Sequence, residues 1–472
     1  MPDILVLGAG VNGLTLAMLL AGDGHRVTVL ERDGADPGGR EADELWHGWL
    51  RRGVSQFRQP HFLLPRWRAV MADELPAVLD EMVAMGALRA NLLAMMPERM
   101  RGPLREGDES HELVTARRPV LEGALARVAS ATPGVRIRRG VAVTGLVTGP
   151  EAIAGVPHVA GVLTGAGETI RADLVVDATG RRSPVVGMLD AIGCRRPVEE
   201  REESGFVYYA RHFRSPDGTR PESAGLVLQH FESVSLLTLP ADSGTWATAF
   251  VASSRDKRLR ALRTVPAWER ALALFPGHAA WGEGEPIGDV QVIAGIEDRY
   301  RRFVVDGAPV VTGLVAVGDA WACTNPSLGR GVTIGLLHAR ALRDLLRTTG
   351  PGEPEKLARG FDETTEATIT PLYRATLATD RHRLAEIDSE IGGEPYRTSD
   401  PAWLIGTAMY GLAHHDPDVL RGYMSIAELM ATPEEVLADA ALANKVFTAG
   451  LDLPRYPSPG PRRAELLAAV GA

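Results

Sequence analysis

The chain has 472 residues, which is long enough for two or three domains and a sizeable core. It carries 60 acidic and 51 basic residues, a formal net charge of −9, and such a surface is unfavourable for nucleic acids and anionic membranes. Its two cysteines, Cys194 and Cys323, are too few for a disulfide framework or a cysteine-based zinc site. We therefore expect a globular cytoplasmic protein with no nucleic-acid partner and no metal.

The first apolar run, residues 4–21, has no basic segment before it, contains several glycines and lacks a cleavage site. It is also too short to be a convincing membrane span, so we expect no integral membrane segment. Residues 4–7 are all apolar, as is typical of a buried parallel strand, and the apolar residues of 14–21 recur at helical spacing. Residues 27–30 form the next apolar run, so the chain is predicted to begin with a strand, a helix and a strand.

A glycine motif, Gly8-Ala9-Gly10-Val11-Asn12-Gly13, directly follows the first predicted strand. Glycines allow the tight turn and the close approach of backbone to a pyrophosphate at a helix N-terminus. Glu31 ends the second predicted strand, 18 residues after Gly13, where a carboxylate can accept hydrogen bonds from ribose hydroxyls. This combination predicts a dinucleotide site without saying which dinucleotide is bound.

The predicted elements then continue in chain order. Helical spacing appears in two stretches and strand patterns in three: residues 67–85 (interrupted near Pro76), 117–130, 135–146, 156–163 and 174–177. Longer alternating stretches follow, typical of a broad antiparallel sheet that forms the wall of a substrate domain: residues 206–213, 226–239 and 245–252. A buried strand at 314–317 and a helix at 332–346 come next, and only helices and loops are expected beyond Pro351.

Three further features receive structural rather than functional interpretations. The charge run at 299–302 is predicted to be a solvated strand or turn face. His414-His415-Asp416 is predicted to be a capped helix end, because adjacent histidines on a helix point in different directions. Cys323 is predicted to be a buried, inert thiol.

A second glycine motif, Gly318-Asp319-Ala320, follows the buried strand at 314–317 and precedes Pro326, Gly329, Arg330 and Gly331. This pattern would bring an aspartate to a sugar hydroxyl and a helix N-terminus toward a flavin, where the positive end of the helix favours an anionic reduced ring.

The two motifs, about 300 residues apart and in this order, resemble the FAD-binding elements of the superfamily that includes p-hydroxybenzoate hydroxylase, squalene epoxidase, geranylgeranyl reductases and flavin-dependent halogenases. The resemblance covers about residues 3–346. It implies an α/β fold with a Rossmann-like FAD-binding domain, an antiparallel-sheet substrate domain and a helical C-terminal region. The corresponding domain boundaries would be 1–193 with 300–350, 194–299 and 351–472.

The resemblance also implies the residues that hold FAD. Asp319 is similar to the aspartate that contacts the ribityl chain, and Arg117 or Arg118 is similar in position to an arginine that reaches the pyrophosphate. The full predicted set is Gly8, Gly10, Asn12, Gly13, Glu31, Arg32, Arg117, Val143, Gly180, Gly318, Asp319, Pro326, Gly329, Gly331 and Val332.

The segment Asp177-Ala178-Thr179-Gly180-Arg181 departs from the hydroxylase pattern, because Thr179 stands where hydroxylases carry an aspartate that serves both FAD and NAD(P)H. Its Ala-Thr-Gly-Arg form resembles halogenases, alkene reductases and polyether-forming epoxidases, and residues 59–65 also resemble the epoxidase branch. The Trp-x-Trp-x-Ile-Pro motif of tryptophan halogenases is absent, so a halogenase is not expected. NADPH or NADH would supply electrons directly or through a partner flavin reductase.

Candidate substrate residues lie on the predicted central sheet, where alternation puts Phe206 and Tyr208 on one face and Tyr209 on the other. The full set is Phe206, Tyr208, Gln229, Phe231 and Trp246. Arg58 and His61 are candidates for the neighbourhood of the isoalloxazine ring, because relatives place this loop there. For each of these residues, ordinary packing or solvation is an equally good interpretation.

The resemblance implies an FAD-dependent monooxygenase that hydroxylates or epoxidises a hydrophobic small molecule with molecular oxygen, of the kind found in secondary metabolism. In this superfamily reduced FAD forms a C4a-hydroperoxide that transfers one oxygen atom, and the protein supplies position and a dry site. Two alternatives remain open: an FAD-dependent reductase of isolated double bonds, and a non-catalytic flavin-binding protein.

Overall fold

A five-stranded parallel sheet forms one half of the molecule in the computed structural model, which describes residues 2–450 and 453–471. Its strand order is β20-β9-β1-β2-β5. The strands are β1 (Asp3–Leu7), β2 (Arg26–Glu31), β5 (Val135–Arg139), β9 (Leu174–Asp177) and β20 (Leu314–Ala316). Helix α1 (Val11–Gly22) connects β1 to β2, so the predicted strand-helix-strand start is confirmed.

The two faces of this sheet bury alternate residues of each strand, as the pleat requires. Ile4 and Val6 pack into a core with the helices α1, α6 (Arg118–Ala131) and α9 (Gly331–Leu346). Leu5 and Leu7 face the opposite core, beneath a small antiparallel sheet and helix α7. That second layer consists of β6 (Val143–Ile153), β7 (Val156–Thr164), β8 (Thr169–Arg171) and α7 (Val185–Ala191).

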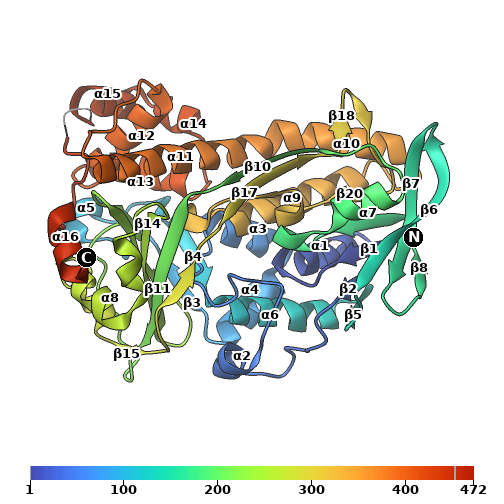
Figure 1. Cartoon of the computed structure of the whole chain (residues 1–472), viewed down its shortest axis with the longest axis horizontal. Helices are drawn as coiled ribbons and strands as arrows, with labels where there is room; N and C mark the ends of the chain where they lie inside the picture. The colour runs from blue at the N-terminus through green and yellow to red at the C-terminus, as the bar shows by residue number, and fades with distance from the viewer. Residues whose placement is uncertain (1, 451–452, 472) are drawn as a thin grey trace.

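A second, antiparallel sheet forms the other half of the molecule, with strand order β12-β13-β14-β11-β15 and β16 paired to β11 (Figure 1). Its strands are β11 (Phe206–Arg214), β12 (Leu228–His230), β13 (Val234–Pro240), β14 (Thr245–Ser253), β15 (Glu285–Pro286) and β16 (Gln291–Ile293). Phe206 and Tyr208 pack on one face and Tyr209 on the other, as alternation predicts. The Tyr209 face is covered by α8 (Val265–Leu272) and α16 (Arg463–Val470).

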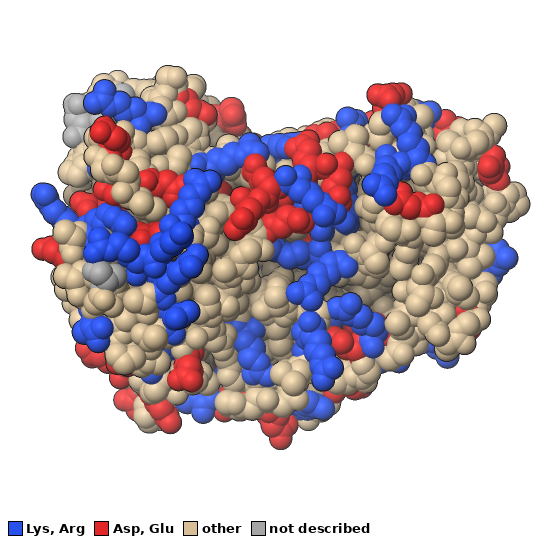
Figure 2. Space-filling view, in the orientation of Figure 1, with Lys and Arg blue, Asp and Glu red and all other residues tan. Residues whose placement is uncertain are grey.

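Two long strands, β10 (Val198–Glu203) and β17 (Glu297–Arg302), run between the halves and pair with each other; β21 (Ala322–Cys323) joins β17 (Figure 1). Residues 299–302 were predicted to be a solvated strand or turn face; they form a strand, and the predicted solvation is wrong for all of them except Arg302. Arg299, Tyr300 and Arg301 are buried, and glutamates and backbone carbonyls accept hydrogen bonds from the two guanidinium groups. The solvated part of the band is formed by β10 and its partners, where acidic and basic side chains alternate on the surface (Figure 2).

Helices occupy the chain after residue 351, as predicted. They are α10 (Pro354–Thr368), α11 (Thr370–Gly392), α12 (Pro401–Leu412), α13 (Pro417–Ala427), α14 (Pro433–Leu437), α15 (Ala440–Ala449) and α16. Figure 1 shows α11 running along one side of the molecule, with α12 to α15 grouped beyond its C-terminal part. In residues 2–450 and 453–471 no helix is long and apolar enough to cross a bilayer.

Further helices and strands complete the fold. They are α2 (Ala42–Gly48), α3 (Pro65–Glu74), α4 (Pro76–Ala84), β3 (Leu88–Asn91), α5 (Glu98–Arg101), β4 (Glu112–Thr115), β18 (Val304–Val305) and β19 (Ala308–Pro309). The helical stretch predicted at 67–85 is therefore two helices that meet at Pro76. A proline is tolerated in the first turn of a helix but not in its interior.

Candidate functional site

A cavity of about 850 Å³ extends between the two sheets. It begins at the carboxyl ends of β1 and β2, passes the second glycine motif and β11, and reaches the helices α11 to α13. Ligands of open parallel α/β sheets bind at the carboxyl ends of the strands, so this position suits a dinucleotide.

The three glycines of the first motif differ in whether the protein itself excludes a side chain at their positions. Gly8 has φ +100°, and a Cβ there would lie 2.7 Å from the carbonyl oxygen of Ala178. A Cβ at Gly13 would lie 2.0 Å from the carbonyl oxygen of Gly8, so the helix and the turn pack against each other. Gly10 lines the cavity, and a Cβ there meets no atom within 4 Å. Helix α1 starts here without a side-chain cap, which leaves its first amides available to a phosphate.

Glu31 lies at the edge of the cavity and organises the glycine turn. Its carboxylate accepts hydrogen bonds from the backbone amides of Ala9 and Asp33, each at 2.9 Å. It also accepts a hydrogen bond from Arg51 Nη2 at 2.6 Å. The ion pair with Arg51 is a feature that the sequence pattern did not indicate.

Arg51 connects Glu31 to a buried charged network. Its Nη1 donates to Glu122 Oε2 at 2.5 Å, and Arg118 Nε donates to the other oxygen of Glu122 at 2.6 Å. Burial alone would lower the pKa of Arg51, but Glu122 and Glu31 raise it overall. Arg51 and Arg118 both line the cavity at its dinucleotide end, where Glu31, Asp33 and Glu122 balance their charge.

His61 extends this network and is a neutral base. Burial and the charge of Arg118 lower its pKa to about 3. The neutral ring fits its partners, because Nδ1 donates to the Gln59 carbonyl at 2.8 Å while Nε2 accepts from Arg118 Nη1 at 3.1 Å. His61 lines the cavity, whereas Arg58 lies outside the lining and donates to the Trp49 carbonyl.

Of the two adjacent arginines that the sequence suggested for the pyrophosphate, the structure brings only Arg118 to the cavity. Arg117 is buried elsewhere, where it pairs with Asp242 at 2.6 Å and with Asp43 at 3.2 Å. Its charge is therefore already balanced by carboxylates, and its side chain joins α6 to the antiparallel sheet.

The second glycine motif packs directly on the first. Gly318 has φ +58°, and a Cβ there would lie 2.1 Å from Asn12 Nδ2. The Oδ1 atom of Asn12 is buried without a hydrogen-bond partner among the described residues, and Asn12 lines the cavity. Arg299 and Arg301 donate to the carbonyls of Asp319 and Ala320, at 3.0 Å and 2.9 Å, and so brace the turn that presents Asp319.

The loop before α9 also faces the cavity. Gly329 has φ +66°, a left-handed conformation that favours glycine. Gly331 begins α9 without a side-chain cap, so the N-terminal amides of this helix are available on the cavity side.

In the middle motif, Thr179 is held by Asp177. The Thr179 hydroxyl donates to Asp177 Oδ1 and the Ser183 hydroxyl to Asp177 Oδ2, both at 2.5 Å. Gly180 lines the cavity with φ +78°, and a Cβ there would meet no atom within 4 Å.

Thirteen of the fifteen predicted cofactor residues line the cavity. They are Gly8, Gly10, Asn12, Glu31, Arg32, Val143, Gly180, Gly318, Asp319, Pro326, Gly329, Gly331 and Val332. Gly13 packs behind the turn and Arg117 lies outside, as described above.

Of the five substrate candidates, only Tyr208 lines the cavity. Phe206 lies in the core on the same face of β11, and the Gln229 amide donates to the Leu226 carbonyl inside the protein. Phe231 and Trp246 pack in the core on the opposite side of the sheet, with α8. The part of the cavity that lies against the antiparallel sheet is called the chamber below. Its wall is formed by aliphatic residues that the sequence did not single out: Leu226, Leu237, Leu239, Ala249, Ile293 and Ile296.

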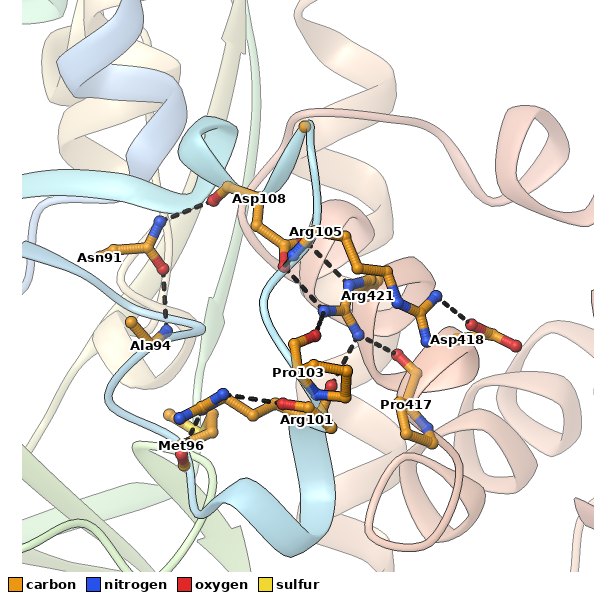
Figure 3. A network of polar contacts seen from close by, with 12 residues as sticks. Asn91, Ala94, Met96, Arg101, Pro103, Arg105, Asp108, Pro417, Asp418 and Arg421 are labelled. Carbon is orange, nitrogen blue, oxygen red and sulfur yellow. Dashed lines mark hydrogen bonds and ion pairs between the residues drawn. The ribbon is translucent and has the colours of Figure 1, made fainter.

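Helices α12 and α13 complete the chamber with Trp403, Tyr410, Tyr423 and Met424. A polar clasp holds α13 in place (Figure 3). Arg421 donates to both carboxylate oxygens of Asp108 at 2.7 Å, and its guanidinium also reaches the carbonyls of Arg101 and Pro103, while Arg105 pairs with Asp418 at 2.6 Å. The N-terminal half of the chain thus holds a wall that the C-terminal half supplies.

A buried polar cluster lies behind the chamber. The Tyr208 hydroxyl donates to Asn325 Oδ1 at 2.7 Å, and Asn325 Nδ2 and the Ser327 hydroxyl both donate to Asp380 Oδ1, at 3.1 Å and 2.7 Å. Burial raises the pKa of Asp380 to about 7 and that of Asp298, which accepts from the Asn325 amide, to about 6. Burial also raises the pKa of Tyr208 well above its ordinary value, so this phenol stays protonated.

The segment at 414–416 and Cys323 have structural surroundings, as predicted. Asp416 caps the N-terminus of α13, and His414 Nδ1 bonds the Tyr410 carbonyl. Cys323 lies outside the cavity lining, and burial raises the pKa of its thiol to about 11. In the described ranges no group of three or more His, Cys, Asp or Glu is arranged to hold a metal ion.

Comparisons with known proteins agree with this geometry. Residues 3–345 match the family model described as FAD dependent oxidoreductase. The protein Rv3254 of Mycobacterium tuberculosis (strain ATCC 25618 / H37Rv) is 30% identical over 482 residues, which cover 94% of this chain and 93% of that protein.

Solved structures show the same fold at low identity. The structure of pqsL, a probable FAD-dependent monooxygenase from Pseudomonas aeruginosa, has TM-score 0.58 and 18% identity over 82% of this chain and 99% of that one. The p-nitrophenol 4-monooxygenase PnpA from Pseudomonas putida DLL-E4 has TM-score 0.57 and 16% identity over 94% and 98%. The flavin-dependent halogenase CmlS has TM-score 0.57 and 17% identity over 91% and 76%. With two glycine motifs packed at the carboxyl ends of a parallel sheet and a family model that spans both, the chain belongs to the FAD dependent oxidoreductase family.

Proposed function

We propose that the protein is an FAD-dependent monooxygenase that hydroxylates or epoxidises a hydrophobic small molecule. The observation that carries this proposal is the continuity of the cavity: one space extends from the two glycine motifs to an apolar chamber on β11, β13 and β14. A flavin held at the motifs would thus meet a substrate inside an apolar enclosure, and exclusion of water protects reactive oxygen chemistry. The structural likeness to PnpA and pqsL supports the same choice.

The residues that would hold FAD follow from the geometry. The amides at the start of α1, with Arg51 and Arg118, suit the pyrophosphate; Glu31 suits the adenosine ribose; and Asp319 suits the ribityl chain. The uncapped start of α9 at Gly331 would place its positive end at the flavin ring. Bound and reduced, FAD would supply oxygen activation.

The reaction balances when one oxygen atom of O₂ enters the substrate and the other leaves as water, with NADPH or NADH giving two electrons. What this chain contributes is orientation and dryness. Tyr208 stays protonated at the chamber wall, and His61 stays neutral between the Gln59 carbonyl and Arg118. Position 179 is a threonine and offers no carboxylate to a nicotinamide, and its hydroxyl is already bonded to Asp177. We therefore propose that a partner flavin reductase can take the place of direct reduction.

The test is anaerobic addition of NADPH, and then of NADH, to the purified FAD-loaded protein, while flavin absorbance is followed near ~450 nm. Bleaching faster than that of free FAD at the same concentration would establish direct reduction. If the flavin stays oxidised, the same experiment is repeated with a flavin reductase present. Failure of the protein to take up FAD would overturn the proposal.

Oxygen uptake separates the proposed reaction from the two alternatives. A monooxygenase consumes one O₂ for each oxygenated product. A reductase of isolated double bonds makes product in the absence of O₂, and a flavin carrier makes no product with any reductant.

A further inference from the structure

The cavity has a second region that the cofactor motifs do not account for. It continues between α11, α12 and α13, where its lining includes Ala375, Ala378, Ala402 and Gly406. These four small residues are also exposed at the surface, so the cavity opens to solvent between α11 and α12. The apolar chamber is therefore accessible from this side of the molecule.

Arg330 lines this region of the cavity and is a poorly satisfied cation. Its guanidinium has two long contacts, both 3.4 Å and both to neutral acceptors: Thr376 Oγ1 on α11 and the Ile426 carbonyl at the end of α13. Its Nε is buried without a partner among the described residues. Within residues 2–450 and 453–471, no carboxylate lies within 4.0 Å of this guanidinium. Burial lowers the pKa of Arg330, which is the effect expected of a cation that lacks a counter-ion.

The other charged residues of the lining on this side are already paired. Arg455 forms an ion pair with Glu386, Glu428 bonds His111, and Asp400 caps α12. The nearest acid on α11, Asp380, is held through Oδ1 by Ser327 and Asn325 rather than by Arg330. With its pKa raised to about 7, Asp380 carries only part of a negative charge at neutral pH.

We propose that Arg330 binds the carboxylate of the substrate, and that the substrate class is therefore a hydrophobic carboxylic acid that enters between α11 and α12. The acid group would complete the hydrogen bonding of Arg330, and the apolar part would lie against Leu237, Leu239 and Met424 in the chamber. This inference rests on the proposed function for its catalytic meaning, but the binding itself does not depend on turnover.

The test compares two probes of matched shape, octanoate and its uncharged methyl ester, by isothermal titration into the FAD-loaded protein. At about pH 7 octanoate is already fully ionised, while Asp380 still carries only part of its charge. A charge-assisted hydrogen bond to a partly buried guanidinium contributes about 1.5–3 kcal/mol, so octanoate is expected to bind roughly 10- to 150-fold more tightly than the ester. Equal affinity of the two probes would overturn the proposal.

Three variants identify the group that is responsible. Arg330→Gln should abolish the preference for octanoate and leave the affinity for the ester unchanged, whereas Arg330→Lys should keep part of the preference. Asp380→Asn removes the nearest negative charge while it keeps the oxygen that Ser327 and Asn325 contact, so octanoate should bind at least as tightly as in the unchanged protein. If Asp380→Asn abolishes the preference for octanoate over the ester as fully as Arg330→Gln does, the preference does not come from Arg330.

The two proposals fail in different ways. If the unchanged protein binds octanoate more tightly than the ester but no reductant supports oxygenation, the carboxylate site stands and the monooxygenase assignment falls. If the flavin is reduced and oxygen is consumed but the probes bind equally, the reaction stands and the substrate class falls. The FAD affinity of each variant is measured alongside, so that loss of cofactor is not mistaken for loss of the carboxylate site.

Discussion

At the scale of single residues, Gly10 and Gly13 of the first glycine turn are required for two different reasons. At Gly13 the neighbouring backbone leaves no room for a Cβ, because the Gly8 carbonyl oxygen would be 2.0 Å away. At Gly10 there is free space on the cavity side, and only a bound cofactor would need it. Gly13 therefore serves the fold, whereas Gly10 serves the ligand.

Gly10→Ala and Gly13→Ala should accordingly have opposite profiles. Gly10→Ala should leave the melting temperature of the apoprotein unchanged and weaken FAD binding, because the methyl group would occupy the cradle of the pyrophosphate. Gly13→Ala should destabilise the apoprotein itself by about 1–3 kcal/mol, the usual cost of overpacking. Thermal melts of the apoproteins and FAD titrations measure both quantities. Equal FAD affinity in Gly10→Ala and the unchanged protein would show that the phosphate does not lie at this turn.

The residue scale also shows what sequence patterns can and cannot predict at this site. The glycines and Asp319 were predictable, because backbone geometry near a phosphate and a sugar restricts which residue types fit. The choice between Arg117 and Arg118 was not. Both begin the same helix, and the choice depends on Asp242, a residue 125 positions away that binds Arg117.

At the scale of elements, α13 forms a wall of the chamber that depends on contacts with the chain around Asp108 (Figure 3). Within this clasp the half-buried Arg421 is bound on both sides, by a bidentate carboxylate and by several carbonyls. The ion pair of Arg105 with Asp418 lies at the surface. The clasp therefore contains a strong member and a weak one, and each can be removed separately.

Arg421→Ala should loosen α13 while the cofactor half stays intact. Removal of the guanidinium leaves the buried Asp108 with only the Arg105 backbone amide as a donor, which should cost about 2–4 kcal/mol. Amide hydrogen exchange should then speed up in residues 417–427 and stay unchanged in β1 and α1.

Arg105→Ala is the matched control, because an exposed ion pair contributes little to stability. It should leave both the exchange of α13 and the stability of the protein close to those of the unchanged chain. If the two variants behave alike, the clasp does not hold the wall.

The chain order of elements was well predicted because parallel strands and their helices leave periodic patterns in a short stretch of sequence. The charge run at 299–302 shows the limit of that approach. Four consecutive polar or aromatic residues are typical of a solvent-exposed segment. Here, however, Glu199 and the carbonyls of the second glycine motif accept hydrogen bonds from the buried arginines. Such partners come from distant segments and leave no local signal.

At the scale of the whole molecule, the cavity contacts every major layer: the parallel sheet, the antiparallel sheet and the C-terminal helices. A ligand that spans these layers binds only when all of them are folded together. FAD is therefore expected to stabilise the molecule as one unit rather than one half of it.

Removal of FAD should lower the melting temperature and leave a single transition in scanning calorimetry. For a site-specific ligand the stabilisation is about 4 kcal/mol at a free concentration about 1,000 times Kd. Titration with FAD should raise the transition temperature steadily, and Gly10→Ala should need more FAD for the same shift. Two separate transitions, of which only one moves with FAD, would contradict this prediction.

The cavity as a whole could not be predicted from the sequence, although its cofactor end could. Tyr208 was a candidate, but Leu226, Tyr410 and Met424 look like ordinary core residues until the fold brings them to one space. The helices after residue 351 were predicted as helices, and nothing in their periodicity said which face would meet the chamber.

The position of β20 in the chain has a consequence for how the protein matures in the cell. This edge strand of the parallel sheet lies at Leu314–Ala316, after the entire antiparallel sheet, and Gly331 follows it. Translation proceeds from the N-terminus, so a nascent chain on the ribosome presents the first glycine turn long before the second one exists. Stable capture of the cofactor therefore has to wait until about 70% of the chain has been made, and the substrate chamber closes later still, when α13 has emerged.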